Sequence, residues 1–334
     1  MSLLSVKDLR TSFFTSRGEV QAVRGVSFEV RPGEILGIVG ESGSGKSITC
    51  MSVLRLLKSS GRVIGGEALF EGRDLLQLDD DGLRELRGND IAMIFQDPMT
   101  SLNPTLSVGE QVMETILRHR KVSRAEARQR AIELFELVRI PNAAERLKAY
   151  PHQFSGGMRQ RVMIAMALSC DPKLLIADEP TTALDVTIQR QILALLKELQ
   201  SRLGMAVILI THDLGVIAEV TDRVLVMYGG MAMEEGPVRD VFKRPSHPYT
   251  RGLLASIPNL RDGTHHRLKP IPGSPPDMLR PPTGCPFAPR CPSAMRQCEA
   301  AVPPLFSIGE GHEARCWLHH PDAPKVSPAL EATP

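Results

Sequence analysis

The sequence predicts an α/β domain followed by a separate, loop-rich extension, and three observations support this fold class. Short apolar runs of strand length recur along the chain, helical patterns lie between them, and the composition changes near Pro258. Strands that alternate with helices are typical of a sheet covered by helices.

Five β-rich runs are predicted to be strands. They span residues 34–39, 90–95, 173–177, 205–210 and 223–227. Their side chains are apolar almost without interruption, which is the pattern of strands buried on both faces of a parallel sheet.

Two helical patterns between these runs are well marked. Ser123 and Glu126 form a capping-box pattern, which predicts that a helix begins there. One face of that helix carries Ala131, Leu134, Phe135 and Val138. A later helix is predicted to end at Gly204. Its apolar stripe consists of Ile188, Ile192, Leu195, Leu196, Leu199 and Leu203.

The change of composition predicts a domain of residues 1–257 and an extension of residues 258–334. Most of the prolines and four of the six cysteines lie in the extension, where periodicity is weak. Residues after Pro321 are expected to be disordered.

Bulk properties exclude several classes of protein. The 334 residues are 42% hydrophobic and carry a formal net charge of +2, which is too balanced to favour a nucleic-acid binder. No apolar run approaches the roughly 20 residues that span a bilayer, and the N-terminus does not match a signal peptide. We therefore expect a cytosolic protein that acts at a membrane only through a partner.

Residues 40–47 match the phosphate-binding pattern G-x-x-x-x-G-K-[ST] between a predicted strand and a helix expected to run to about Leu57. Glycines allow backbone N–H groups to surround phosphate oxygens, and the helix N-terminus adds a positive dipole. Lys46 supplies a charge and Ser47 a ligand for Mg²⁺. A Gly/Ser-rich turn is the alternative. The predicted site consists of Gly40, Glu41, Ser42, Gly43, Ser44, Gly45, Lys46 and Ser47.

Two carboxylates, Asp178 and Glu179, follow the apolar run 173–177. Acidic residues at a strand end are often only turn formers. Beside a phosphate-binding loop, however, they predict nucleotide hydrolysis. Asp178 would hold Mg²⁺ through water, and Glu179 would be the general base.

Residues 154–160 read Phe-Ser-Gly-Gly-Met-Arg-Gln between these two motifs. Ser155, Gly156 and Gly157 are predicted to open a helix whose N–H groups form a second anion site. This segment resembles the LSGGQ signature of the ATP-binding cassette (ABC) family.

Further segments resemble other motifs of that family. Gln96 is similar to the glutamine loop, Asp185 ends a segment similar to the D-loop, and His212 is similar to the switch histidine. Phe13 resembles the aromatic residue that stacks on adenine, with Phe14 as the alternative. The resemblance implies that Glu179, His212 and Gln96 are catalytic and that Ser47, Gln96 and Asp178 bind Mg²⁺.

The family resemblance implies a P-loop NTPase fold with a mixed sheet core, an antiparallel β subdomain and a helical subdomain at about residues 97–170. It also implies that two cassettes meet head to tail. Each ATP would lie between the phosphate loop of one chain and the signature of the other.

Several segments narrow the resemblance to oligopeptide/dipeptide importers, and most closely to the first of their two ATP-binding subunits. These segments are residues 96–104, 150–152, 154–168, 247–250 and 271–276. The resemblance implies a second, different ATPase subunit, two permease subunits, an extracytoplasmic peptide-binding protein and a place at the cytoplasmic face of the membrane.

The extension carries Cys285, Cys291, Cys298 and Cys316. Their spacing leaves an iron–sulfur cluster, a zinc ion and no ligand at all as possibilities, although zinc sites favour closer pairs. The spacing resembles the [4Fe–4S] ligands of the importer group. Three nearby histidines are expected to be solvated, namely His312, His319 and His320.

Two other functions compete with the transporter. A soluble ABC ATPase acting on ribosomes or DNA usually has two cassettes or long coiled coils, and this chain has one motif set and no sustained heptads. A catalytically inactive cassette is disfavoured because every catalytic motif is present. Nickel, opines, glutathione and oligosaccharides are alternative cargoes.

Overall fold

The structure is a computed structural model of the chain, and it describes residues 2–97, 101–182, 184–256 and 270–324. The chain forms two compact units, each built from three separate stretches of sequence. The first unit comprises Met1–Ser5, Glu29–Leu36 and Glu67–Thr211, and the second comprises Val6–Phe28, Gly37–Gly66 and His212–Pro334.

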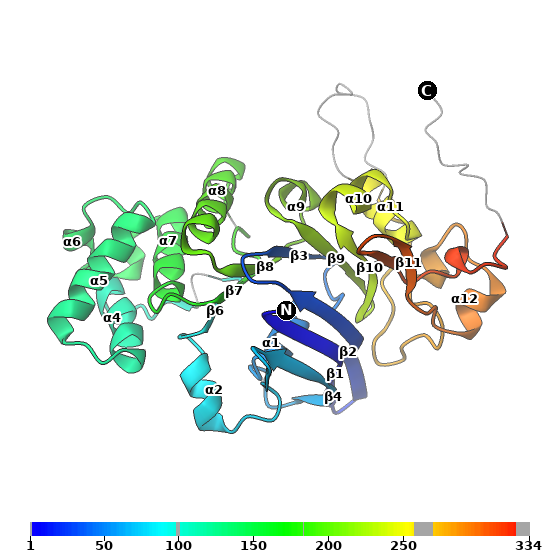
Figure 1. Cartoon of the computed structure of the whole chain (residues 1–334), viewed down its shortest axis with the longest axis horizontal. Helices are drawn as coiled ribbons and strands as arrows, with labels where there is room; N and C mark the ends of the chain where they lie inside the picture. The colour runs from blue at the N-terminus through cyan, green and yellow to red at the C-terminus, as the bar shows by residue number, and fades with distance from the viewer. Residues whose placement is uncertain (1, 98–100, 183, 257–269, 325–334) are drawn as a thin grey trace. The chain divides into compact units, whose positions relative to one another are not determined.

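The strands of the described residues form two sheets (Figure 1), with orders β2-β1-β4-β5 and β11-β12-β10-β9-β3-β8-β7-β6. Their bounds are β1 Leu4–Thr15, β2 Gly18–Val30, β3 Ile35–Val39, β4 Gly61–Phe70, β5 Arg73–Asp74, β6 Ile91–Ile94, β7 Leu174–Asp178, β8 Ala206–Ile210, β9 Arg223–Tyr228, β10 Met231–Pro237, β11 Phe306–Gly309 and β12 His312–Ala314. All five strands predicted from the sequence are present.

Four of the α-helices in the described residues have 12 residues or more, and the others have eight or fewer. Their bounds are α1 Lys46–Val53, α2 Asp80–Leu86, α4 Val108–His119, α5 Arg124–Leu137, α6 Ala143–Arg146, α7 Gly156–Ala167, α8 Val186–Leu203, α9 Leu214–Val220, α10 Val238–Lys243, α11 Pro248–Ala255 and α12 Arg296–Ala300.

Three parallel strands of the first unit are β6, β7 and β8. Ile91 pairs with Leu174, and Leu174 pairs with Ala206 on the other side. Every residue of β7 and β8 is buried. Both faces of these strands are therefore shielded from water, which explains their unbroken apolar pattern.

Helices α4 to α7 lie together in the first unit (Figure 1), inside the span 97–170 predicted to be a helical subdomain. The capping box of α5 is confirmed. Ser123 Oγ accepts a hydrogen bond from Glu126 N at 3.2 Å, and Ser123 N donates to Glu126 Oε2 at 2.7 Å. The apolar face predicted for this helix is fully buried.

Helix α8 ends where the sequence predicted. Gly204 adopts a left-handed conformation with φ of 66° and closes the helix. Most of the predicted stripe is buried, but Leu203 at the last position is 38% exposed.

Helix α1 ends at Val53 rather than near Leu57 as predicted. Arg55 adopts a left-handed conformation with φ of 50°. Leu56 N donates to Met51 O at 2.8 Å and Arg55 N donates to Ser52 O at 3.0 Å. These two bonds form a Schellman motif, which closes the helix without the glycine that usually signals it.

The second unit contains an antiparallel ladder. β9 pairs with β10, β10 with β12, and β12 with β11, all antiparallel. The strand predicted at 223–227 is therefore present as β9, but the expectation of parallel neighbours is wrong for the β9–β10 pair.

Strands β11 and β12 lie in the extension that the sequence suggested to be loop-rich. They are four and three residues long, and half-buried and exposed residues alternate in β11, so neither has a strong apolar pattern. The predicted boundary at residue 258 lies outside the described residues. Most of the tail that was expected to be disordered also lies outside them.

Candidate nucleotide-binding site and cysteine pocket

The phosphate-binding loop connects β3 to α1 in the second unit. Gly40, Gly43 and Gly45 have φ values of 149°, 78° and 101°, which favour glycine. A Cβ atom on Gly40 would lie 2.1 Å from Met227 O, and one on Gly45 would lie 2.6 Å from Ala22 O. Backbone conformation and space therefore both require Gly40 and Gly45, whereas backbone conformation alone favours Gly43.

The polar groups of this loop fit an anion. Lys46 is 6% exposed, and its Nζ donates to the carbonyl oxygens of Gly40 at 2.8 Å and Glu41 at 3.0 Å. Ser44 Oγ is buried without a hydrogen-bond partner in the structure. The buried Lys46 ammonium and the Ser44 hydroxyl therefore form, with the glycines of the loop, an anion site. A phosphate group bound there would accept hydrogen bonds from both side chains.

Glu41 in the same loop is held by residues that sequence reasoning missed. Its N–H donates to Tyr249 Oη at 2.8 Å, and its carboxylate contacts both terminal nitrogens of Arg290. No local pattern predicts these contacts, because the partners lie more than 200 positions further along the chain.

The acidic pair lies at the end of β7 in the first unit. Asp178 is 2% exposed. Glu179 has a left-handed backbone with φ of 47°, and its Oε2 accepts hydrogen bonds from Gln96 Nε2 at 2.9 Å and Thr182 Oγ1 at 2.8 Å. The structure thus brings the predicted base and the predicted glutamine-loop residue into direct contact.

The signature segment opens α7 as predicted. Ser155 is the N-cap, and its Oγ accepts from Met158 N at 3.4 Å. Ser155 and Gly156 are exposed. A Cβ atom on Gly157 would lie 2.7 Å from Ile188 in α8, so the second glycine is required by packing.

Three more residues were assigned roles by resemblance. Asp185 caps α8, with Oδ1 accepting from Ile188 N at 3.0 Å, and it remains exposed. His212 is exposed just before α9. Phe13 is half-buried against Gly61, whereas Phe14 is 48% exposed beneath the guanidinium of Arg62. The roles of these residues stay predictions.

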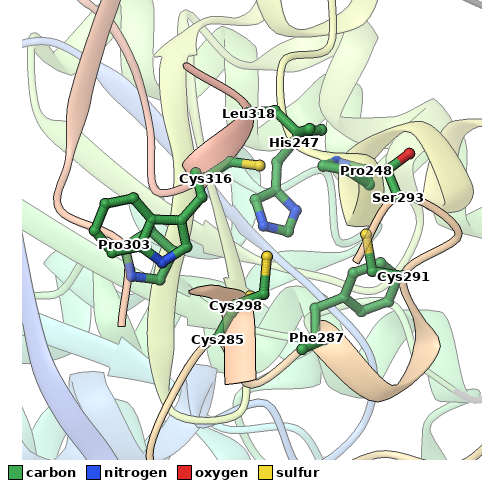
Figure 2. A pocket seen from close by; sticks show the side chains of 12 residues that line it. His247, Pro248, Cys285, Phe287, Cys291, Ser293, Cys298, Pro303, Cys316 and Leu318 are labelled. Atoms are coloured by element: carbon green, nitrogen blue, oxygen red, sulfur yellow. The ribbon is translucent and has the colours of Figure 1, made fainter. Parts of the chain in front are cut away.

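The four cysteines of the extension line one pocket (Figure 2). Cys285, Cys298 and Cys316 are buried and Cys291 is half-buried, and all four are free thiols. The other walls are mostly apolar and consist of His247, Pro248, Phe287, Ala288, Ser293, Pro303, Trp317 and Leu318.

The charge state of these thiols bears on what the pocket can hold. Burial raises the pKa of Cys285 to about 11 and of Cys316 to about 12, and it also raises the pKa of Cys291. The thiols of Cys285 and Cys316 are therefore neutral unless a cation stabilises their thiolates. Within the described residues, no three His, Cys, Asp or Glu side chains are placed to hold a single metal ion.

One prediction about the neighbouring histidines is wrong. His312 is 4% exposed, and its Nε2 lies 2.8 Å from the buried carboxylate of Glu234. His247 is also buried, and burial lowers its pKa to about 4. His319 Nε2 lies 2.9 Å from Ser246 O, so it too has a protein partner.

Comparison with known proteins identifies the family. Residues 23–182 match the model of ABC transporters, and residues 233–298 match the model of the oligopeptide/dipeptide transporter C-terminal region. The chain is 55% identical to the oligopeptide transport ATP-binding protein OppD of Bacillus subtilis (strain 168), over 98% of this chain and 91% of that protein. The chain belongs to the ABC transporter family.

Further relatives agree with this. The ABC protein is 56% identical to the dipeptide transport ATP-binding protein DppD of Bacillus subtilis (strain 168), over 95% of this chain and 94% of that one. It resembles a dimeric post-hydrolysis ATP-binding cassette bound to ADP and Pi, with a TM-score of 0.64 and 30% identity over 71% of this chain and 99% of that chain.

These matches confirm the fold class and the activity expected from the motifs. The ABC protein has the mixed sheet core and the antiparallel β sheet of the family, and it is an ATPase of a transporter. Among the described residues, no helix has the length and apolar character needed to cross a bilayer.

Proposed function

We propose that this ABC ATPase powers the uptake of oligopeptides or dipeptides through a membrane transporter. The observation that carries the proposal is the match of residues 233–298 to the C-terminal region of oligopeptide/dipeptide transporters. The names of the relatives at 55% and 56% identity support it.

In the proposed mechanism, the phosphate loop binds the triphosphate of ATP, which supplies the bond that is hydrolysed. Backbone N–H groups of the loop, apart from those of Glu41 and Ser44, which have protein partners, and the N-terminus of α1 face the phosphate oxygens. Lys46 exchanges its two carbonyl partners for phosphate oxygens. Ser47, Gln96 and Asp178 would hold Mg²⁺, which would neutralise negative charge on the phosphates.

Glu179 acts as the general base that accepts a proton from the attacking water. Gln96 already holds this carboxylate at 2.9 Å, so it can report a change at the nucleotide to the helices of residues 97–170. His212 takes the role of the switch histidine, and Phe13 stacks on adenine, with Phe14 as the alternative.

A second chain completes the site in this proposal. Ser155, Gly156, Gly157 and Asp185 face an ATP molecule held by a second, different ABC ATPase. The exposure of Ser155, Gly156 and Asp185 supports this role, because a residue that serves a partner's nucleotide must lie at the surface. Closure of two such chains around ATP is a ligand-driven shift between two states.

The proposed assembly also contains two permease subunits and an extracytoplasmic peptide-binding protein. The ATPase lies at the cytoplasmic face of the membrane, and nucleic acid is not among its partners. Within the chain, residues 1–257 form the nucleotide-binding domain and residues 258–334 the extension.

Uptake of labelled peptides tests the function. A strain without this chain should lose uptake of short peptides, and the wild-type chain should restore it. Lys46→Ala should not restore it, while Lys58→Ala, which changes an exposed lysine beyond α1, should. Loss of nickel, opine, glutathione or oligosaccharide uptake instead would assign a different cargo. Co-sedimentation with ribosomes and unchanged uptake would contradict the transporter.

We also propose that Cys285, Cys291, Cys298 and Cys316 bind a [4Fe–4S] cluster. Four thiols around an apolar pocket suit a cluster, in which each iron takes one thiolate. Chain purified without oxygen should contain about four irons and four sulfides, and Cys298→Ser should lower both. Stoichiometric zinc, or no metal at all, would overturn the assignment.

A further inference from the structure

Arg290, in the extension, is buried and uses every hydrogen-bond donor it has. Its Nε donates to Pro272 O at 2.9 Å, and its Nη1 donates to Glu41 Oε2 at 2.6 Å and Tyr228 Oη at 3.0 Å. Its Nη2 donates to Glu41 Oε1 at 3.0 Å and Ile271 O at 3.0 Å. A guanidinium has five N–H groups, so all of them are satisfied here.

Glu41 is the second residue of the phosphate-binding loop, and three of its groups are held. Its N–H is bound by Tyr249, its C=O accepts from Lys46, and its carboxylate forms a two-bond pair with Arg290. Only an arginine can pair with a carboxylate through two parallel N–H groups, so lysine would not replace it.

The pair also solves an electrostatic problem. A carboxylate in a loop that binds a triphosphate repels the ligand, and the repulsion grows where water is scarce. Glu41 is only 27% exposed, and Arg290 is 4% exposed. The hydrogen bond to Glu41 raises the pKa of Arg290, so the guanidinium stays charged and cancels the carboxylate.

Residues of the extension also lie beside the phosphate-binding loop. Part of the phosphate-binding loop shares a pocket with two prolines and a methionine of the extension. The lining residues are Glu41, Ser42, Gly43, Ser44, Tyr228, Gly229, Pro275, Pro276 and Met278. Met278 is anchored there, because its carbonyl oxygen accepts from Gln21 N at 3.0 Å.

We propose that Arg290 is a positioning residue for nucleotide binding, which neutralises Glu41 and fixes the phosphate-binding loop in the form that receives the triphosphate. The inference rests on the assignment of ATP to this loop. Because Arg290 belongs to the extension, this role makes the extension part of the nucleotide site. In the sequence, Arg290 lies between Cys285 and Cys291 of the cysteine pocket.

The test measures the dissociation constant of MgATP and the KM and kcat of hydrolysis. Arg290→Ala should weaken ATP binding by about 5- to 150-fold, the usual range of coupling between linked sites, and raise KM more than it lowers kcat. The ATP affinity of Arg290→Lys should lie between that of the wild type and that of Arg290→Ala. Arg280→Ala, an exposed arginine of the same extension, should match the wild type.

The double variant separates charge neutralisation from folding. Glu41→Gln combined with Arg290→Ala removes the carboxylate that Arg290→Ala leaves unneutralised, so the double variant should bind ATP more tightly than Arg290→Ala alone. If the double variant binds ATP as weakly as Arg290→Ala, or if Arg290→Ala binds like the wild type, the inference is wrong. Absence of ATP binding in the wild-type chain would instead refute the nucleotide site itself.

Discussion

At the scale of single residues, the clearest functional feature is the conformation of Glu179. Its left-handed backbone costs a non-glycine residue about 1–2 kcal/mol. Two hydrogen bonds, from Gln96 and Thr182, hold its carboxylate at the end of β7. Backbone strain that persists at such a position is typical of a site whose geometry serves function.

Replacement of this residue should separate binding from chemistry. Glu179→Gln keeps the shape of the side chain and one oxygen that can accept from Gln96 and Thr182, but it cannot act as a base. We expect ATP affinity close to that of the wild type and hydrolysis slower by about 10²–10⁴-fold, with nucleotide-bound dimers accumulating. Turnover of ATP in the purified transporter measures this. Glu198→Gln, an exposed glutamate of α8, is the control, and wild-type turnover by Glu179→Gln would exclude it as the base.

The sequence predicts residues of short motifs well and residues of distant contacts poorly. Gly40, Lys46 and Ser155 lie where the motifs placed them, because each motif is a local unit of loop and helix. Arg290 was missed because only folding brings it to Glu41. His312 was misjudged because the composition of the extension suggested a solvated loop, whereas a buried carboxylate binds the ring.

At the scale of elements, prediction succeeded where burial left a strong pattern and failed where it did not. The strands β6, β7 and β8 and the helices α5 and α8 have continuous or periodic apolar residues. Strand β10 and the short strands β11 and β12 are stabilised by antiparallel pairing between backbones, which leaves little trace in side-chain pattern.

The end of α1 offers a test at this scale. Arg55 occupies the left-handed position of its Schellman motif, where glycine carries no steric penalty. Arg55→Gly should raise the free energy of unfolding by about 0.5–1 kcal/mol. Urea denaturation with and without ATP measures it. Arg55→Ala should give no gain, because alanine keeps the Cβ atom; equal stabilisation by both variants would disprove the backbone explanation.

At the scale of the whole molecule, the exposed signature predicts that function requires two chains. Gly156→Asp places a negative charge where a partner's phosphate would approach, and its Cβ atom would meet only the side chain of Leu184, in a close contact of 3.3 Å. We expect the isolated variant to bind ATP normally and the assembled transporter to lose at least about 90% of its hydrolysis. Gly156→Ala is the control. Reduced ATP affinity in the isolated variant would contradict a role for this residue towards a partner.

The contacts of Glu41 also bear on how the protein is made. Its partners Tyr249 and Arg290 follow it by 208 and 249 positions. Synthesis proceeds from the N-terminus, and pairings between distant positions form slowly. The glycine-rich turn therefore leaves the ribosome long before Tyr249 and Arg290 have been synthesised. A nascent or prematurely terminated chain lacks these two contacts. The ability to bind nucleotide is thus acquired among the last events of folding.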